Sequence, residues 1–175
     1  MKTAVVVIIF NRPKKTKLLF SSIRKYKPSK LFIISDGPRK NVLDDFEKVK
    51  ETRKIFEKIP WKCKIFTNYS NKNLGTRKRI VSGVDWVFKN VEEAIFLEDD
   101  CIPSRKFFPF MEKMLIRYKS NLKIGSVCGS NFLSKWNLNK ESYLYSKYFN
   151  PWGWATWKNR WQKLDKNLKT LDSSK

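Results

Sequence analysis

The chain has 175 residues, enough for one domain with a substantial core. Lys and Arg number 38 against 16 Asp and Glu, a net charge of +22, but the basic residues are scattered over nearly every segment rather than gathered in a tail or stripe. The absence of histidine excludes imidazole general bases, Ser-His triads and His-ligated metals, and three cysteines without paired spacing predict neither a disulfide framework nor a zinc site.

Apolar runs alternate with helical patterns from the start of the chain. Residues 4–10 are apolar and mostly β-branched, which predicts a strand covered on both faces. Helical spacing follows at 18–26, and a second buried strand is expected at 31–34. From Asn41 to Ile59 we expect another helix, whose apolar stripe consists of Val42, Leu43, Phe46, Val49, Ile55, Phe56 and Ile59.

The second half continues this alternation. We expect a weak strand at 64–67, a helix opened by Asn73-Leu-Gly75-Thr76, and a buried strand at 94–97. Pro103-Ser104 begins a further helix, 124–129 is predicted as a fifth strand, and 134–148 is expected to be irregular. The segment 152–164 is predicted to be helical, with Trp154, Trp157 and Trp161 near one stripe that favours core packing.

Fourfold strand–helix alternation predicts an α/β fold with a mainly parallel sheet between helices. Ligands of such folds bind beyond the carboxyl ends of the strands. The polar segments that leave the strands should therefore converge on one edge of the sheet. These segments are Asn11-Arg12, Ser35-Asp36-Gly37, Asn68 to Gly75 and Glu98-Asp99-Asp100.

Three consecutive carboxylates, Glu98, Asp99 and Asp100, end the strand at 94–97. Such a cluster is costly unless a positive charge neutralises it, and Mg²⁺ or Mn²⁺ commonly bridges carboxylates to phosphates. The alternative is a solvated acidic turn. The chain lacks both G-x-x-x-x-G-K-[ST] and G-x-G-x-x-G, so a nucleotide diphosphate would be held through the metal. Asp36 and Arg12 are suited to base, ribose or phosphate contacts, or else are a turn former and a surface cation.

Five motifs in order carry a family resemblance. They resemble GT-A fold glycosyltransferases, and the likeness is closest to the N-acetylglucosaminyltransferase I type and the bacterial family-2-like sugar transferases. The segment from Phe149 to Lys158 looks like the Gly-Trp segment of these enzymes. The motifs are Ile9-Phe-Asn-Arg12, Ile34-Ser-Asp-Gly37, Asn73-Leu-Gly75, Phe96-Leu-Glu-Asp-Asp100 and Phe107-Phe108.

The resemblance implies a GT-A fold, Mn²⁺ or Mg²⁺ as cofactor, and a nucleotide-diphospho-sugar donor, with UDP-sugars favoured. Asp100 looks like the direct metal ligand, while Glu98 and Asp99 would contact ribose or order the loop. Trp152, with Gly153 and Trp154, would form the rim for the acceptor or sugar. The other residues implied in nucleotide-sugar binding are Asn11, Arg12, Asp36, Asn73 and Gly75.

The chain also departs from the family. Asn11 stands where the eukaryotic relatives have an acidic residue, and the family continues beyond Lys175 into a segment that supplies the catalytic carboxylate. Residues 1–175 are therefore expected to form a single GT-A domain that lacks the acceptor part. The base is unassigned, with Glu141, Asp165 and Asp172 as the remaining candidates.

The expected function is sugar transfer to a glycan or lipid-linked acceptor in bacterial polysaccharide or glycoconjugate synthesis. The alternatives are a non-catalytic nucleotide-sugar-binding domain and a basic nucleic-acid-binding protein, although no reading module predicts a specific nucleic-acid partner. No apolar run approaches the roughly 20 residues of a membrane-spanning helix. We expect a cytoplasmic protein, with peripheral contact with an anionic membrane at its inner face as a further option.

Overall fold

The computed structural model describes residues 2–131 and 142–166. In this part of the chain a six-stranded sheet has the order β3-β2-β1-β4-β6-β5. The first four strands in sequence are parallel to one another, β6 is antiparallel to β4, and β5 is antiparallel to β6. The strands are β1 Ala4–Ile9, β2 Lys30–Ser35, β3 Lys64–Tyr69, β4 Glu93–Glu98, β5 Val127–Cys128 and β6 Trp154–Trp157.

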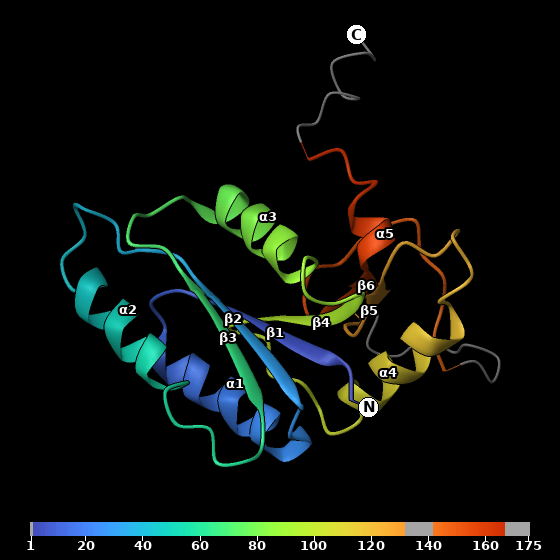
Figure 1. Ribbon diagram of the computed structural model, residues 1–175, viewed down its shortest axis with the longest axis horizontal. Helices are drawn as coiled ribbons and strands as arrows, with labels where there is room; N and C mark the ends of the chain where they lie inside the picture. The colour runs from blue at the N-terminus through green and yellow to red at the C-terminus, as the bar shows by residue number, and fades with distance from the viewer. Residues whose placement is uncertain (1, 132–141, 167–175) are drawn as a thin grey trace, which may run out of the picture.

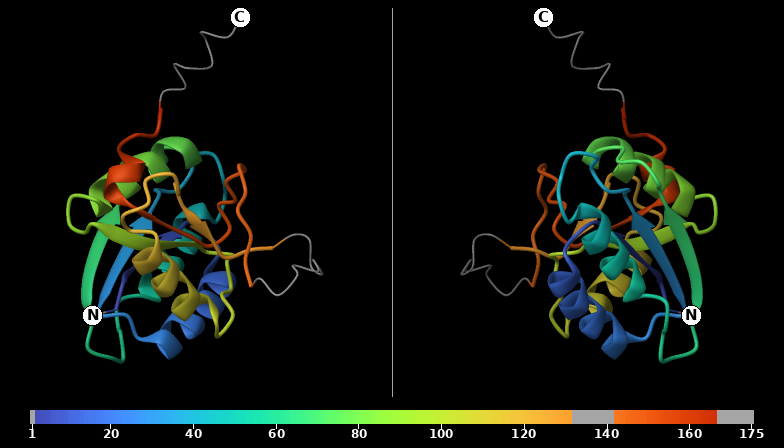
Figure 2. Two further views of the ribbon diagram at one scale, coloured as in Figure 1. Left: turned by 90° about the vertical axis from the view of Figure 1, so that its right-hand side faces the viewer. Right: turned by 90° about the vertical axis from the view of Figure 1, so that its left-hand side faces the viewer.

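Helices cover both faces of the sheet, so the predicted α/β class with a mainly parallel sheet is confirmed (Figure 1). Helices α1, α2 and α4 lie on one side and α3 and α5 on the other, and Figure 2 shows this division from two further directions. None of the helices in the described residues is long and apolar enough to cross a membrane. The helices are α1 Pro13–Tyr26, α2 Asp45–Lys54, α3 Thr76–Val87, α4 Phe107–Arg117 and α5 Lys158–Trp161.

The central strands β1, β2 and β4 are buried on both faces, as continuous apolar runs require in a covered parallel sheet. Alternate residues contribute to two separate clusters. Val5 and Val7 pack with α1 and α4, whereas Val6 packs with α3. These buried runs hold the strand ends in register, and the segments that follow β1, β2 and β4 therefore leave the sheet at one edge.

The helix predicted at 152–164 is wrong in its first half. Residues Trp154–Trp157 instead form β6, in which Trp154 pairs with Phe96 of β4, and helical structure is confined to Lys158–Trp161. Trp154 and Trp161 pack in the cluster with α3, whereas Trp157 lies in the cluster on the opposite face. The expected tryptophan stripe is therefore split by the sheet, although all three side chains are buried as predicted.

Two other boundaries also differ. Helix α2 begins only at Asp45. The first part of its predicted apolar stripe is exposed, because Val42 and Leu43 precede the helix and Phe46 is 65% exposed, whereas Val49 and Phe56 of the same stripe are buried. The fifth strand is two residues long rather than six. Most of the segment expected to be irregular lies outside the described residues, and 142–148 contains no helix or strand.

Candidate functional site

A cavity of about 260 Å³ opens at the C-terminal edge of the parallel strands. All four polar segments predicted to converge there contribute to its lining. They supply Arg12 after β1, Asp36 after β2, Asn73 and Gly75 before α3, and Glu98 and Asp99 at the end of β4. The remaining lining residues are Ile8, Ile9, Phe10, Arg39, Thr76, Arg79 and Ile80.

The turn after β2 is tied to the loop before α3 by the carboxylate of Asp36. This buried carboxylate accepts hydrogen bonds from the backbone N–H groups of Gly37, Leu74 and Gly75 at 2.9–3.1 Å. The Asn73 side chain adds a bond of 2.9 Å to the carbonyl oxygen of Gly37. Asp36, predicted as a base contact, therefore uses both of its oxygens to hold the wall of the cavity.

Two glycines make this close approach possible. A side chain on Gly37 would place its Cβ 2.6 Å from the backbone of Lys72, which passes over the turn. Gly75 has a φ of 77°, a left-handed conformation that other residues adopt at a cost. The motifs that carry the family resemblance thus contain the residues that bring two loops together.

The acidic run after β4 meets Arg12 from the end of β1. Arg12 Nη1 lies 3.2 Å from Asp99 Oδ1 and 2.7 Å from Asp100 Oδ2. Asp99 is buried and also accepts a bond of 3.3 Å from the backbone N–H of Phe10. In the part of the chain that the structure describes, the side-chain carboxylate of Glu98 accepts no hydrogen bond. The Arg12 guanidinium therefore forms ion pairs with two of the three carboxylates and leaves Glu98 without one.

The pKa values of two carboxylates in the acidic run are raised. Burial, together with the nearby charges of Asp100 and Asp99, raises the pKa of Glu98. Burial also raises the pKa of Asp99, although Arg12 and the Phe10 amide act in the opposite direction. The carboxylates consequently retain an affinity for a proton or an added cation.

The donor set of this acidic run is suited to a hard divalent cation. Asp100 is partly exposed, and its Oδ1 accepts no hydrogen bond from the described residues. Within 2–131 and 142–166, no three His, Cys, Asp or Glu side chains are grouped so as to hold a metal ion by themselves. Mg²⁺ is usually held by only one or two carboxylates together with water and phosphate oxygens. The residues present therefore fit a cation that is bound jointly with a phosphate ligand.

Two arginines in the cavity wall were not predicted. Arg79 of α3 is 5% exposed, and its Nη2 donates to the backbone and side-chain oxygens of Asn68. Its Nε has no hydrogen-bond partner among the described residues, and burial lowers the pKa of its guanidinium. Arg39 follows the Gly37-Pro38 turn and is held by Asp45. An apolar spacing pattern cannot indicate either role, because both depend on polar contacts that only the folded chain brings together.

Several predicted residues lie elsewhere. Asn11 is not among the residues that line the cavity, and its side-chain amide donates to Asp45 at 2.6 Å. Trp154 was assigned to the acceptor rim, but it is buried and stacks on Phe96 with a centroid distance of 4.3 Å. This assignment is corrected, because pairing within the sheet directs the ring into the core. Gly153 packs beside Phe107, whereas Trp152 is 59% exposed.

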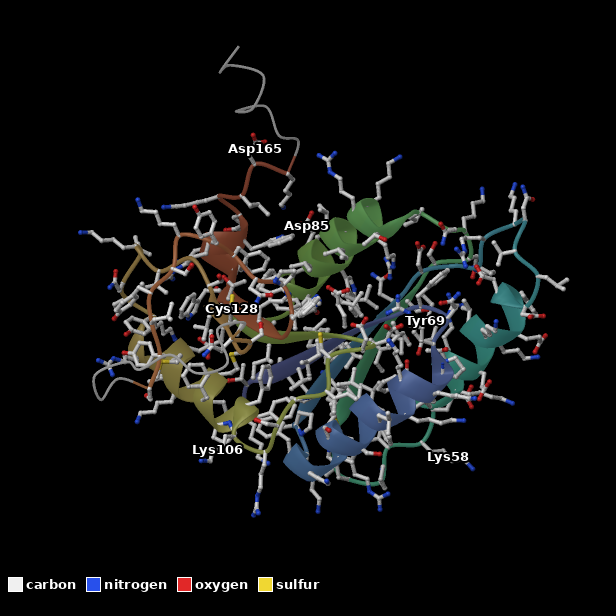
Figure 3. The ribbon with its side chains drawn as sticks, turned by 180° about the vertical axis from the view of Figure 1, so that it is seen from behind. Lys58, Tyr69, Asp85, Lys106, Cys128 and Asp165 are labelled. Atoms are coloured by element: carbon white, nitrogen blue, oxygen red, sulfur yellow. The ribbon has the colours of Figure 1, made fainter. Side chains whose placement is uncertain are left out.

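Of the three candidate catalytic carboxylates, only Asp165 lies in the described residues, and it does not line the cavity. Asp165 lies close to the C-terminal end of the described chain, far from Tyr69, which marks the end of β3 (Figure 3). Glu141 and Asp172 lie outside the described residues. Among the described carboxylates, those that line the cavity are Asp36, Glu98 and Asp99.

No protein-family model matches the sequence, and the search of curated proteins finds no match. Among solved structures, the chain resembles a mannosyltransferase from Pyrobaculum calidifontis in complex with GDP-Man and Mn²⁺, with a TM-score of 0.49 and 11% identity over 74% of this chain and 36% of that one. It also resembles the 4-diphosphocytidyl-2C-methyl-D-erythritol synthase from Anaerococcus prevotii DSM 20548, with a TM-score of 0.47 and 10% identity over 90% of this chain and 72% of that one. The chain thus spans about a third of the mannosyltransferase, and similarity at this level does not transfer an activity or a substrate.

Proposed function

We propose that the chain is a nucleotide-diphospho-sugar-binding domain of a metal-dependent glycosyltransferase. The observation that carries this proposal is the acidic run Glu98–Asp100, which is short of positive charge and adjoins a cavity of about 260 Å³ at the carboxyl ends of parallel strands. Parallel α/β sheets bind ligands at this edge, and clustered carboxylates with raised pKa values favour a cation there.

Each part of the proposed site has a defined task. Asp100 and Asp99 would supply oxygen ligands to Mn²⁺ or Mg²⁺, which when bound offsets the charge that develops on the departing diphosphate. Arg12 touches both carboxylates and is half-exposed, so it can also donate to a phosphate oxygen. Asp36 and Asn73 keep the two loops of the nucleotide pocket closed against each other. Trp152, exposed on the segment before β6, would contact the acceptor.

Calorimetric titration with UDP and GDP, in Mn²⁺ and in EDTA, tests this proposal. We expect binding at least tenfold tighter with Mn²⁺, and Asp100→Ala should remove that difference, because a cation bridge needs this carboxylate. Glu92→Ala, which removes an exposed carboxylate just before the start of β4, is the matched control and should leave the cation effect intact. Equal affinity in Mn²⁺ and EDTA would reject the metal bridge.

A thermal-shift panel of nucleotide sugars then identifies the donor, since a ligand that binds only the folded state raises the midpoint of unfolding. We propose that the domain binds the donor but transfers its sugar slowly. No residue of the cavity is assigned as the catalytic base, and the lack of a positioned base typically lowers the rate about 10²–10⁴-fold. Slow hydrolysis of the donor is the expected residual activity. Rapid transfer to an added acceptor would contradict this part of the proposal.

A further inference from the structure

Asp45, the first residue of α2, is a buried carboxylate with an unusually complete set of donors. It is 1% exposed. Its Oδ2 accepts bonds from Arg39 Nε at 2.7 Å and the Arg39 backbone N–H at 3.1 Å, and its Oδ1 accepts bonds from Arg39 Nη2 at 3.0 Å and Asn11 Nδ2 at 2.6 Å. Asp45 thus fixes the Arg39 side chain through a two-pronged bond and links it to the segment that leaves β1.

Arg39 is held on a second side by an aromatic ring. Its guanidinium carbon lies 5.5 Å from the centre of the Phe10 ring, and both residues line the cavity. A guanidinium has five N–H groups, and the bonds to Asp45 use two of them. Three N–H groups remain on a side chain that is half-exposed and held in one orientation. Arg39 is therefore a preorganised donor in the cavity wall.

Asn11, which follows β1, is a suitable neighbour for the buried carboxylate of Asp45. Its amide nitrogen lies 2.6 Å from Asp45, so an acidic residue at position 11 would place two carboxylates in contact. Such a pair would repel and would compete for Arg39. The asparagine, which departs from the pattern of the eukaryotic relatives, is the side chain that completes the donor set of Asp45.

The wall around Arg39 offers few acceptors to a ligand. The oxygens of Asp36 are taken by backbone N–H groups, and those of Asp45 by Arg39 and Asn11. Arg79, with an unpartnered Nε, adds a second guanidinium to the lining. If the diphosphate lies at the acidic run after β4, as the proposed function requires, the nucleoside extends toward this donor-rich wall. A carbonyl at C4 of a pyrimidine or C6 of a purine finds a partner there, whereas an amino group at the same position meets other N–H groups.

We propose that Arg39 is a specificity-determining residue that selects nucleobases with a carbonyl group at C4 of a pyrimidine or C6 of a purine, and that Asp45 is the positioning residue that holds it. This inference rests on the proposed function, since it requires a nucleoside diphosphate in the cavity. It extends that function by naming the part of the donor that is read and the two residues responsible.

Paired titrations with UDP and CDP test the inference, because these ligands differ only at the C4 substituent and the adjoining N3. We expect the wild-type protein with Mn²⁺ to bind UDP about tenfold more tightly than CDP, and GDP more tightly than ADP. Arg39→Gln should weaken UDP binding about tenfold with little change for CDP, so that the ratio approaches one. Arg39→Lys keeps the charge but not the two-pronged bond, and it should lose most of the discrimination. Asp45→Asn should reduce the ratio while Arg39 is still present.

A variant of the same helix provides the control. Glu51→Gln removes the α2 side of an exposed ion pair with Lys17 and should leave the UDP/CDP ratio unchanged. Should Asp45→Asn fail to fold, the two Arg39 variants still decide the matter, because that side chain is half-exposed. Equal binding of UDP and CDP by the wild type, or equal weakening of both by Arg39→Gln, would overturn the inference and assign Arg39 to a phosphate. Failure of every nucleoside diphosphate to bind would defeat the proposed function itself.

Discussion

Asp45 on α2 and the acidic residues Glu98 and Asp99 at the end of β4 lie at the same edge of the sheet, but their pKa values are shifted in opposite directions. Asp45 and Asp99 are both buried, at 1% and 6% exposure. The hydrogen bonds from Arg39, followed by those from Asn11 and the Arg39 backbone, lower the pKa of Asp45 despite its burial. Burial instead raises the pKa values of Glu98 and Asp99.

At Asp45 the hydrogen bonds outweigh the effect of burial on the pKa, whereas at Asp99 burial outweighs the fewer hydrogen bonds. Asp45 accepts four hydrogen bonds, whereas the described structure gives Asp99 two and shares Arg12 between Asp99 and Asp100. A fully satisfied carboxylate stabilises the fold and positions its neighbours. A carboxylate with too few donors is available to bind something else. The comparison therefore distinguishes Asp45, which positions its neighbours, from the carboxylates that we propose bind a ligand.

The largest expected effect is on the stability provided by Asp45. Asp45→Ala should lower the free energy of unfolding by about 2–3 kcal/mol, below the usual value for a broken buried ion pair because Arg39 can reach solvent. Urea unfolding measures the change. Asp44→Asn, at the exposed neighbouring carboxylate, is the control and should cost less than about 0.5 kcal/mol. Similar losses for the two variants would refute the distinction between a satisfied and an exposed carboxylate.

Asp36 supplies an intermediate case, since its partners are backbone N–H groups without a formal charge. Asp36→Asn should lower the free energy of unfolding by about 1–2 kcal/mol, because one oxygen is replaced by an amide that faces N–H donors. Hydrogen exchange at the amides of Leu74 and Gly75 should accelerate at the same time. If stability falls while those amides stay protected, the loop is held by other contacts.

Acid titration should separate Asp45 from the acidic run. The pKa of Asp45 is lowered by folding, so its contribution is complete above its unfolded value of about 4 and is lost as pH falls below it. Urea unfolding between about pH 6 and 2.5 should therefore show a steeper loss of stability in the wild type than in Asp45→Asn. Parallel curves for the two proteins would mean that Asp45 does not carry a lowered pKa.

The smallest effect is expected at Asp100. Asp100→Asn should change the free energy of unfolding by less than about 1 kcal/mol in the absence of ligand, because the pair with Arg12 is partly exposed and the substitution also relieves repulsion from Glu98 and Asp99. Thermal unfolding with and without Mn²⁺ and UDP measures both roles in one experiment. A loss as large as that of Asp45→Ala would make Asp100 a structural residue.

Much of the sheet could be predicted from local patterns. The runs at 4–10, 31–34 and 94–97 are apolar over their whole length, and a parallel strand covered on both faces is the structure such runs favour. Polar residues at their ends then implied convergence at one edge. Arg12, Asp36, Glu98 and Asp99 do lie together around the cavity, although their roles toward a nucleotide stay proposals.

The segment Trp154–Trp157 could not be predicted in the same way. Tryptophans at positions 154, 157 and 161 match helical spacing, and only the pairing with β4 makes Trp154–Trp157 a strand. Similarly, Val42, Leu43 and Phe46 fit a helical stripe, but these side chains are exposed, and the neighbouring Asp45 is buried. Short apolar patterns are compatible with either element, and tertiary pairing decides between them.

The sequence by itself determined the α/β class and the edge of the sheet at which polar residues gather, because both follow from the order and composition of neighbouring residues. Only the tertiary structure decided which carboxylates are satisfied. Asp45 and Arg39 are six residues apart, Asn11 joins them from 34 residues away, and Arg12 reaches Asp99 across 87 residues. The pKa of a buried acid depends on donors within about 3 Å, whatever their place in the sequence, so folding must bring them together before positioning and binding residues can be distinguished.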